Sequence, residues 1–148
     1  MFLSFIIEIA VVALLSLFQL TGVTFLGAVK PDLALLIILA MGAYDKRWTR
    51  RLSWLILSAA ILKFTPGIDW RLTIFAVSAV FGIILIDYLP WTRLISFIIA
   101  VVLSGFMVNL RLFGMEWSAV SKEIILDLVL GVIMFLVASL AYGKKEIH

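Results

Sequence analysis

Six polar or charged side chains interrupt apolar stretches of this sequence, and their chemistry is the first feature to explain. They are Glu8, Lys63, Asp87, Asn109, Arg111 and Asp127. A charged side chain near the centre of a bilayer costs roughly 3 kcal/mol or more, so each charged residue within an apolar stretch is a candidate for function. Charges near the end of a stretch can instead extend to the membrane surface. We expect this for Asp87 and Arg111.

Depth and sidedness decide which of the other ionisable residues can act together. Asp127 lies roughly 6 Å inside its predicted helix at 1.5 Å per residue, and Glu8 lies at a similar depth. Their helices begin at opposite membrane faces, so a carboxylate pair is not expected. Lys63 lies near the same face as Asp127 and Arg111, where we expect structural pairing. A proton relay would need further titratable groups between Glu8 and that outer group, and the sequence supplies only hydroxyls there.

The residue types of common catalytic and metal sites are missing from the apolar stretches. The one histidine is His148, and there is no cysteine. Ser–His catalysis and zinc sites therefore lack a base or ligand inside the fold, and no glycine-rich phosphate loop is found. Proteolysis by paired aspartates also fails, because Asp87 and Asp127 are predicted near opposite faces. We predict no catalytic residue, no cofactor and no metal, and hence a protein that is not an enzyme.

The composition indicates the setting of these residues. Of the 148 residues, 65% are apolar and 14% are charged, with a mean hydropathy of +1.24. A soluble domain is about half apolar and about a quarter charged, so this chain has too little polar surface for water. The net charge of +3 is spread along the chain without the basic face that nucleic acid requires. We predict a single membrane domain over residues 1–148.

Apolar stretches and their breakers predict six helices in this domain. We expect them over residues 2–20, 31–44, 52–64, 72–89, 94–113 and 123–142. A span needs about 20 apolar residues, and the second and third stretches are shorter, so the number of full spans stays open between four and six. The predicted fold class is all-α, a polytopic integral membrane bundle. All Trp and Tyr residues lie near predicted span ends, which is typical of an aromatic belt.

The distribution of basic residues predicts the orientation of the bundle. With the N-terminus inside, seven Lys and Arg residues lie on the cytoplasmic side and five on the other. The densest group, residues 45–51, is predicted to be a short cytoplasmic loop, where the positive-inside rule is most reliable. We therefore expect a multi-pass protein with both termini in the cytoplasm.

Small residues recur along the fifth predicted helix. Ser96, Ala100 and Ser104 stand four residues apart, and Gly105 follows the last of them. Such a stripe lets membrane helices approach closely. The sequence leaves two interpretations open, which are packing within this bundle and contact with a transmembrane helix of a partner.

The segment after the first helix carries a family resemblance. The first helix ends at Gln19, and a short connection leads to KPDLALLIIL, in which Pro31 and Asp32 precede a leucine-rich helix. This segment, with the overall layout of the chain, resembles the MreD family of rod-shape-determining membrane proteins. The chain departs from the family at three positions. Lys63 lies where the family usually has an acidic residue, Asp127 where it often has Asn, and Val132 where it often has Pro.

The resemblance implies a non-enzymatic scaffold in the bacterial cytoplasmic membrane. Such a scaffold binds the bitopic protein MreC and helps couple MreB filaments to RodA and its partner transpeptidase during lateral peptidoglycan synthesis. The candidate contact surface comprises the small-residue stripe of the fifth helix together with Leu33, Leu36 and Ile37.

Two alternative functions remain open at this point. The layout is also similar to that of the substrate-binding membrane subunits of vitamin uptake transporters. Those subunits usually dock through small residues four apart on the first helix, whereas Ala10 and Ala13 are three apart here. A small ion or proton conductor is the other alternative, and it predicts a flux that is lost when Glu8 or Asp127 is neutralised.

Overall fold

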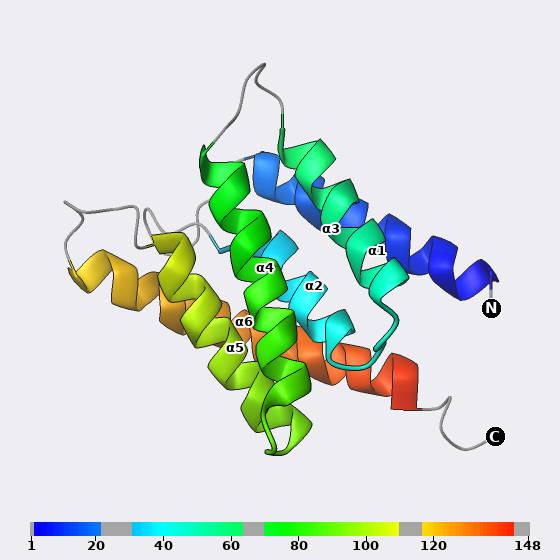
Figure 1. Ribbon diagram of the computed structural model, residues 1–148. Helices are drawn as coiled ribbons and strands as arrows, with labels where there is room; N and C mark the ends of the chain where they lie inside the picture. The colour runs from blue at the N-terminus through cyan, green and yellow to red at the C-terminus, as the bar shows by residue number, and fades with distance from the viewer. Residues whose placement is uncertain (1, 22–30, 64–69, 110–116, 144–148) are drawn as a thin grey trace.

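The computed structural model describes residues 2–21, 31–63, 70–109 and 117–143, which form six α-helices (Figure 1). The helices are α1 (Phe2–Leu20), α2 (Leu33–Gly42), α3 (Trp48–Leu62), α4 (Trp70–Tyr88), α5 (Arg93–Asn109) and α6 (Trp117–Gly143). These four segments contain no strand. The predicted all-α fold is confirmed.

The shortest helix, α2, forms the centre of the molecule. Its sequence, LALLIILAMG, has no polar face, and a helix that is apolar all round needs to be enclosed on every side. All ten of its residues are buried, and α2 contacts each of the other five helices. Around it, α1 packs on α3, α3 on α4, α4 on α5 and α5 on α6. Figure 1 shows α2 in cyan behind α4, between the α1–α3 pair and the α5–α6 pair.

Two helices begin four or more residues earlier than the sequence predicted, because charged residues were taken as helix boundaries. α3 begins at Trp48, so part of the predicted 45–51 loop is its first turn. α6 begins at Trp117 rather than at residue 123. A charged residue is compatible with a helix when it has a partner or reaches the surface. In the first turn of α3, Arg50 and Arg51 have such partners.

Two helices, α4 and α6, are long and apolar enough to cross a membrane. Only 33% of the apolar window of α4 and 22% of that of α6 are buried within the described structure, whereas a core helix of a soluble protein is mostly buried. At ten residues, α2 is about 15 Å long, half of a hydrocarbon core about 30 Å thick. Length and hydropathy thus identify two helices able to span among the described residues, fewer than the four to six spans predicted, and α2 is too short.

The described residues bury polar side chains and expose apolar ones. Nine polar or charged residues are buried, namely Glu8, Ser16, Arg51, Ser58, Ser78, Ser96, Ser104, Asn109 and Asp127. An unbroken line of apolar side chains is exposed along α6, formed by Ile125, Val129, Ile133, Leu136 and Leu140. Contiguous apolar surface of this kind marks contact with a membrane or another protein rather than with water.

The aromatic residues follow the predicted belt with one clear exception. Trp70, Trp91 and Trp117 are exposed and lie at or beside helix ends. Trp54 is fully buried in the core, so its predicted place at a span end is wrong. The reason is that α3 begins at Trp48, which moves Trp54 into the second turn of the helix.

Candidate functional site at the two ends of the buried helix

The start of α2 is capped by side chains from two other helices. The first N–H groups of a helix have no partner within it, and the N-cap residue Asp32 makes no side-chain cap hydrogen bond. Instead, the Ala34 N–H donates to Gln19 Oε1 of α1 at 2.9 Å. The Asp32 N–H donates to Asp127 Oδ1 of α6 at 3.0 Å, and Gln19 Nε2 donates to Asp32 Oδ1 at 2.6 Å. We call Gln19, Asp32 and Asp127 the N-terminal cluster.

The chemistry of the N-terminal cluster suits its position. Asp127, only 2% exposed, brings a carboxylate to the positive end of the α2 dipole. Pro31 is buried beside the cluster and has no N–H to satisfy. Burial raises the pKa of the Asp32 carboxyl, and the hydrogen bond from Gln19 partly opposes that shift. The cluster therefore ties α1, α2 and α6 together through polar contacts.

Asp127 lies deeper in its helix than the sequence predicted. Because α6 begins at Trp117, Asp127 is about 15 Å along the helix at 1.5 Å per residue. Gly105 of α5 faces it, since a Cβ there would lie 3.9 Å from Asp127 Oδ2. One turn further along α5, Asn109 is buried and its Nδ2 donates to the Gly105 carbonyl at 2.9 Å. Polar groups at this end thus bond to the backbone and to one another.

The other end of α2 is capped by a single buried arginine. Arg51 of α3 is 1% exposed, and its Nη2 donates to the Gly42 carbonyl at 2.6 Å. Its Nε donates to the Asp45 carbonyl at 2.7 Å, just after α2. Its two terminal nitrogens donate to the two carboxylate oxygens of Asp87 on α4. This bidentate arrangement uses the fixed fork of the guanidinium, which an ammonium cannot reproduce.

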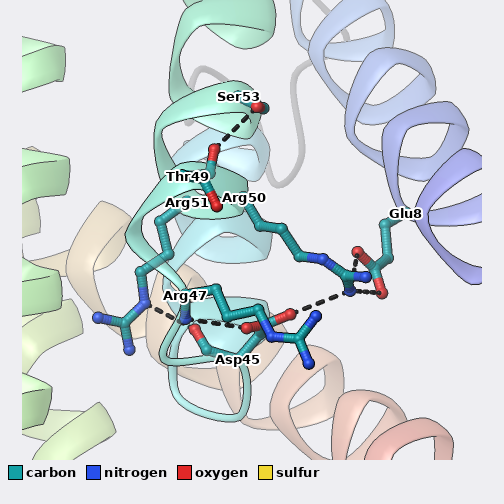
Figure 2. Close-up of polar contacts among 7 residues, drawn as sticks. All are labelled: Glu8, Asp45, Arg47, Thr49, Arg50, Arg51 and Ser53. Carbon is teal, nitrogen blue, oxygen red and sulfur yellow. Dashed lines mark hydrogen bonds and ion pairs between the residues drawn. The ribbon is translucent and has the colours of Figure 1, made fainter. Parts of the chain in front are cut away.

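The neighbouring Arg50 connects α3 to α1. Its Nη1 donates to Asp45 Oδ2 at 3.0 Å and lies 3.4 Å from both carboxylate oxygens of Glu8. In Figure 2, Glu8 extends from α1 and Arg50 from α3, with Asp45 beside the arginine. The Arg50 guanidinium also lies over the Phe5 ring at 5.3 Å. We call Glu8, Asp45, Arg50, Arg51 and Asp87 the C-terminal cluster.

The structure assigns the acidic residues noted in the sequence to two different clusters. Asp87 was expected to extend to the membrane surface; it lies exposed in the last turn of α4, and its carboxylate pairs there with Arg51. Glu8 and Asp127 belong to different clusters, at opposite ends of α2. Lys63 is exposed at the C-terminal end of α3, and Arg111 lies outside the described residues. Among the described residues, no contact joins Lys63 to Asp127.

The small-residue stripe of α5 lies inside the bundle. Ser96, Ala100, Ser104 and Gly105 are all buried. Ser104 Oγ donates to the Ser78 carbonyl of α4 at 3.0 Å. The structure thus favours packing within the bundle over a partner's helix as the use of this stripe.

The proposed contact surface on the second helix is wrong. Leu33, Leu36 and Ile37 are 6%, 1% and 7% exposed, because α2 is enclosed on all sides. No partner can reach them without opening the bundle. The family-like leucine-rich segment is instead the hydrophobic core.

Sequence reasoning missed the two arginines as site residues, because the positive-inside rule alone accounted for them. A signal was present in the acidic residues. Glu8 and Asp87 lie on helices with no basic residue within reach on the same helix, so each needed a cation from elsewhere. The adjacent Arg50 and Arg51 were the densest source. A second missed contact is the buried Ser16–Ser58 hydroxyl pair, 3.1 Å apart between α1 and α3.

The arrangement of the two clusters is suited to holding helices together. Within the part of the chain that the structure describes, no group of three His, Cys, Asp or Glu residues is placed to hold a metal. Comparisons with protein-family models, curated proteins and solved structures give no match. What the geometry supplies is a short apolar helix fixed at both ends by polar contacts from the helices around it.

Proposed function

We propose that this protein is a non-enzymatic scaffold embedded in the bacterial cytoplasmic membrane, with a role like that of the MreD family. The observation that carries the membrane setting is the exposed apolar surface around buried polar clusters. Lipid is the solvent that matches an apolar exterior, and buried charges in such a setting are paired with one another. Glu8 and Arg51 follow this pattern, since each is buried and pairs with an opposite charge.

The family role is supported by where the family-like residues lie. Gln19 and Asp32 meet in the N-terminal cluster, and the leucine-rich segment forms the central helix. The residues that carry the resemblance therefore form one structural unit. In this role the scaffold binds an MreC-like bitopic protein and helps couple MreB filaments to RodA and its transpeptidase.

Two alternatives are less well supported by the geometry. A proton relay would have to connect Glu8 to Asp127, and the ten residues of α2 between their clusters carry no titratable group. A vitamin-binding subunit would need a ligand cavity, and the centre of this bundle is filled by α2.

Co-purification tests the proposed partner. We expect the protein to co-elute with a co-expressed MreC-like protein in mild detergent, and an unrelated polytopic membrane protein of similar size to fail to do so. Separate elution of the two proteins, with the scaffold itself monodisperse, would contradict the proposal.

Reporter fusions test the proposed orientation. With both termini in the cytoplasm, a C-terminal alkaline phosphatase fusion should be inactive and a C-terminal fluorescent protein fusion should be bright. A fusion after residue 89 should behave in the same way. An active phosphatase at the C-terminus would contradict the orientation.

A further inference from the structure

The basic residues between α2 and α3 divide into an inward set and an outward set. Arg50 and Arg51 are engaged in the C-terminal cluster. Lys46 and Arg47 are exposed, and no acidic side chain among the described residues lies within ion-pair distance of either. In Figure 2 no dashed line meets the Arg47 guanidinium, whereas the backbone N–H of Arg47 donates to Asp45 Oδ1 at 2.9 Å.

An exposed apolar line on α3 begins beside these two cations. Trp48, Leu52 and Ile56 stand four residues apart and so lie on one face, with exposed fractions of 43%, 43% and 64%. The Arg51 guanidinium lies 5.4 Å from the centre of the Trp48 ring, which holds the indole at the start of this line. Two cations followed by an apolar line match the headgroup and one acyl chain of a phospholipid.

We propose that Lys46, Arg47 and the apolar line of α3 form a binding surface for an anionic phospholipid. The inference rests on the proposed membrane location and takes it further by naming the class of lipid and the residues that hold it. Charge complementarity selects the anionic class. The C-terminal cluster sets the two guanidiniums of Arg50 and Arg51 against three carboxylates, so these arginines leave no free positive charge. The exposed cations of the segment between α2 and α3 are therefore Lys46 and Arg47.

Native mass spectrometry of protein released from nanodiscs tests this surface. The nanodiscs contain equal amounts of phosphatidylglycerol and phosphatidylcholine. The test variant is Lys46→Gln with Arg47→Gln. The matched control is Lys63→Gln with Lys122→Gln, which removes two exposed charges from the other end of the bundle.

We expect wild type and the control to retain phosphatidylglycerol in preference to phosphatidylcholine. In the Lys46/Arg47 variant this preference should fall by about tenfold or more, since each basic residue near an anionic surface contributes about fivefold in affinity. Equal preference in all three proteins would overturn the proposal. An equal loss in both double variants would also overturn it, because that result assigns the preference to overall charge.

A thermal-shift measurement distinguishes binding of a lipid from binding of a free anion. Added phosphatidylglycerol should raise the melting temperature of the wild type in detergent, and inorganic phosphate should not. An equal rise with phosphate would overturn the assignment to lipid. Loss of the lipid proposal can be told apart from loss of the scaffold proposal. We expect the Lys46/Arg47 variant still to co-elute with the MreC-like protein, whatever its preference for phosphatidylglycerol.

Discussion

Arg51 illustrates how a single residue can hold several helices at once. Its guanidinium is almost wholly buried and donates to the end of α2, to the connection that follows it and to Asp87 of α4. A buried ion pair adds little net stability when compared with apolar residues of the same shape. Removing the arginine is costly, however, because the buried Gly42 carbonyl is then left without its donor. The clusters therefore fix the geometry of α2 more than they raise stability.

Replacing Arg51→Met should lower the free energy of unfolding by about 1–3 kcal/mol, because the carbonyls of Gly42 and Asp45 lose their donor. Arg51→Lys should rescue little of this loss, since one ammonium cannot make the bidentate contact. Thermal unfolding in mild detergent measures both variants. Arg47→Met is the control and should stay close to wild type. An Arg51→Met protein as stable as this control would contradict the role of the C-terminal cluster.

At Asp127, two substitutions distinguish the role of a hydrogen-bond acceptor from that of a charge. Asp127→Asn keeps an oxygen for the Asp32 N–H and should retain most of the stability. Asp127→Leu leaves that N–H unsatisfied and should cost about 1–3 kcal/mol, measured by the same unfolding experiment. Equal stability of the two variants would show that Asp127 does not cap α2.

Among the helices, α4 packs most closely on its neighbours at Gly82. A Cβ on Gly82 would lie 2.6 Å from both Leu39 Cδ2 and Ser104 Oγ. Gly82 is therefore the position at which α4 approaches both α2 and α5. Gly105, on the other face of α5, would place a Cβ no closer than 3.9 Å to its neighbours.

This pair of glycines gives a matched test of helix packing. Gly82→Ala should destabilise the bundle by about 1–3 kcal/mol through overpacking. Gly105→Ala should be neutral or stabilise by up to about 1 kcal/mol, because alanine is the better helix former. Combining Gly82→Ala with Ser104→Ala should recover part of the loss. Equal effects of the two single variants would contradict the packing described for α4.

The elements were largely predictable from the sequence, and the contacts between them were not. Apolar runs and their breakers are local signals, so every helix was located, with errors mainly where charges lie inside a helix. The pairing of Arg51 with Asp87 joins residues 36 positions apart and depends on how α3 and α4 pack, which no local pattern encodes. For the same reason the enclosure of Leu36 was missed. A leucine-rich helix reads alike whether lipid, a partner or its own bundle surrounds it.

Across the described structure, several polar side chains are buried and many large apolar side chains are exposed, which is the opposite of a water-soluble fold. The buried helix is held at each end by a polar cluster, and apolar faces such as that of α6 point outward. In the proposed orientation, the end of the bundle that carries the exposed Lys46 and Arg47 faces the cytoplasm. A bundle with a fixed core and an apolar exterior is suited to meeting other proteins within the bilayer.

Spin-label accessibility in reconstituted vesicles tests this central claim most directly. A nitroxide at position 133 on α6 should collide often with oxygen and rarely with a water-soluble nickel complex, because Ile133 faces lipid in this account. A nitroxide at position 36 on α2 should be shielded from both agents, provided that the labelled protein keeps its helical circular dichroism. High nickel accessibility at position 133 would place that surface in water and contradict the account.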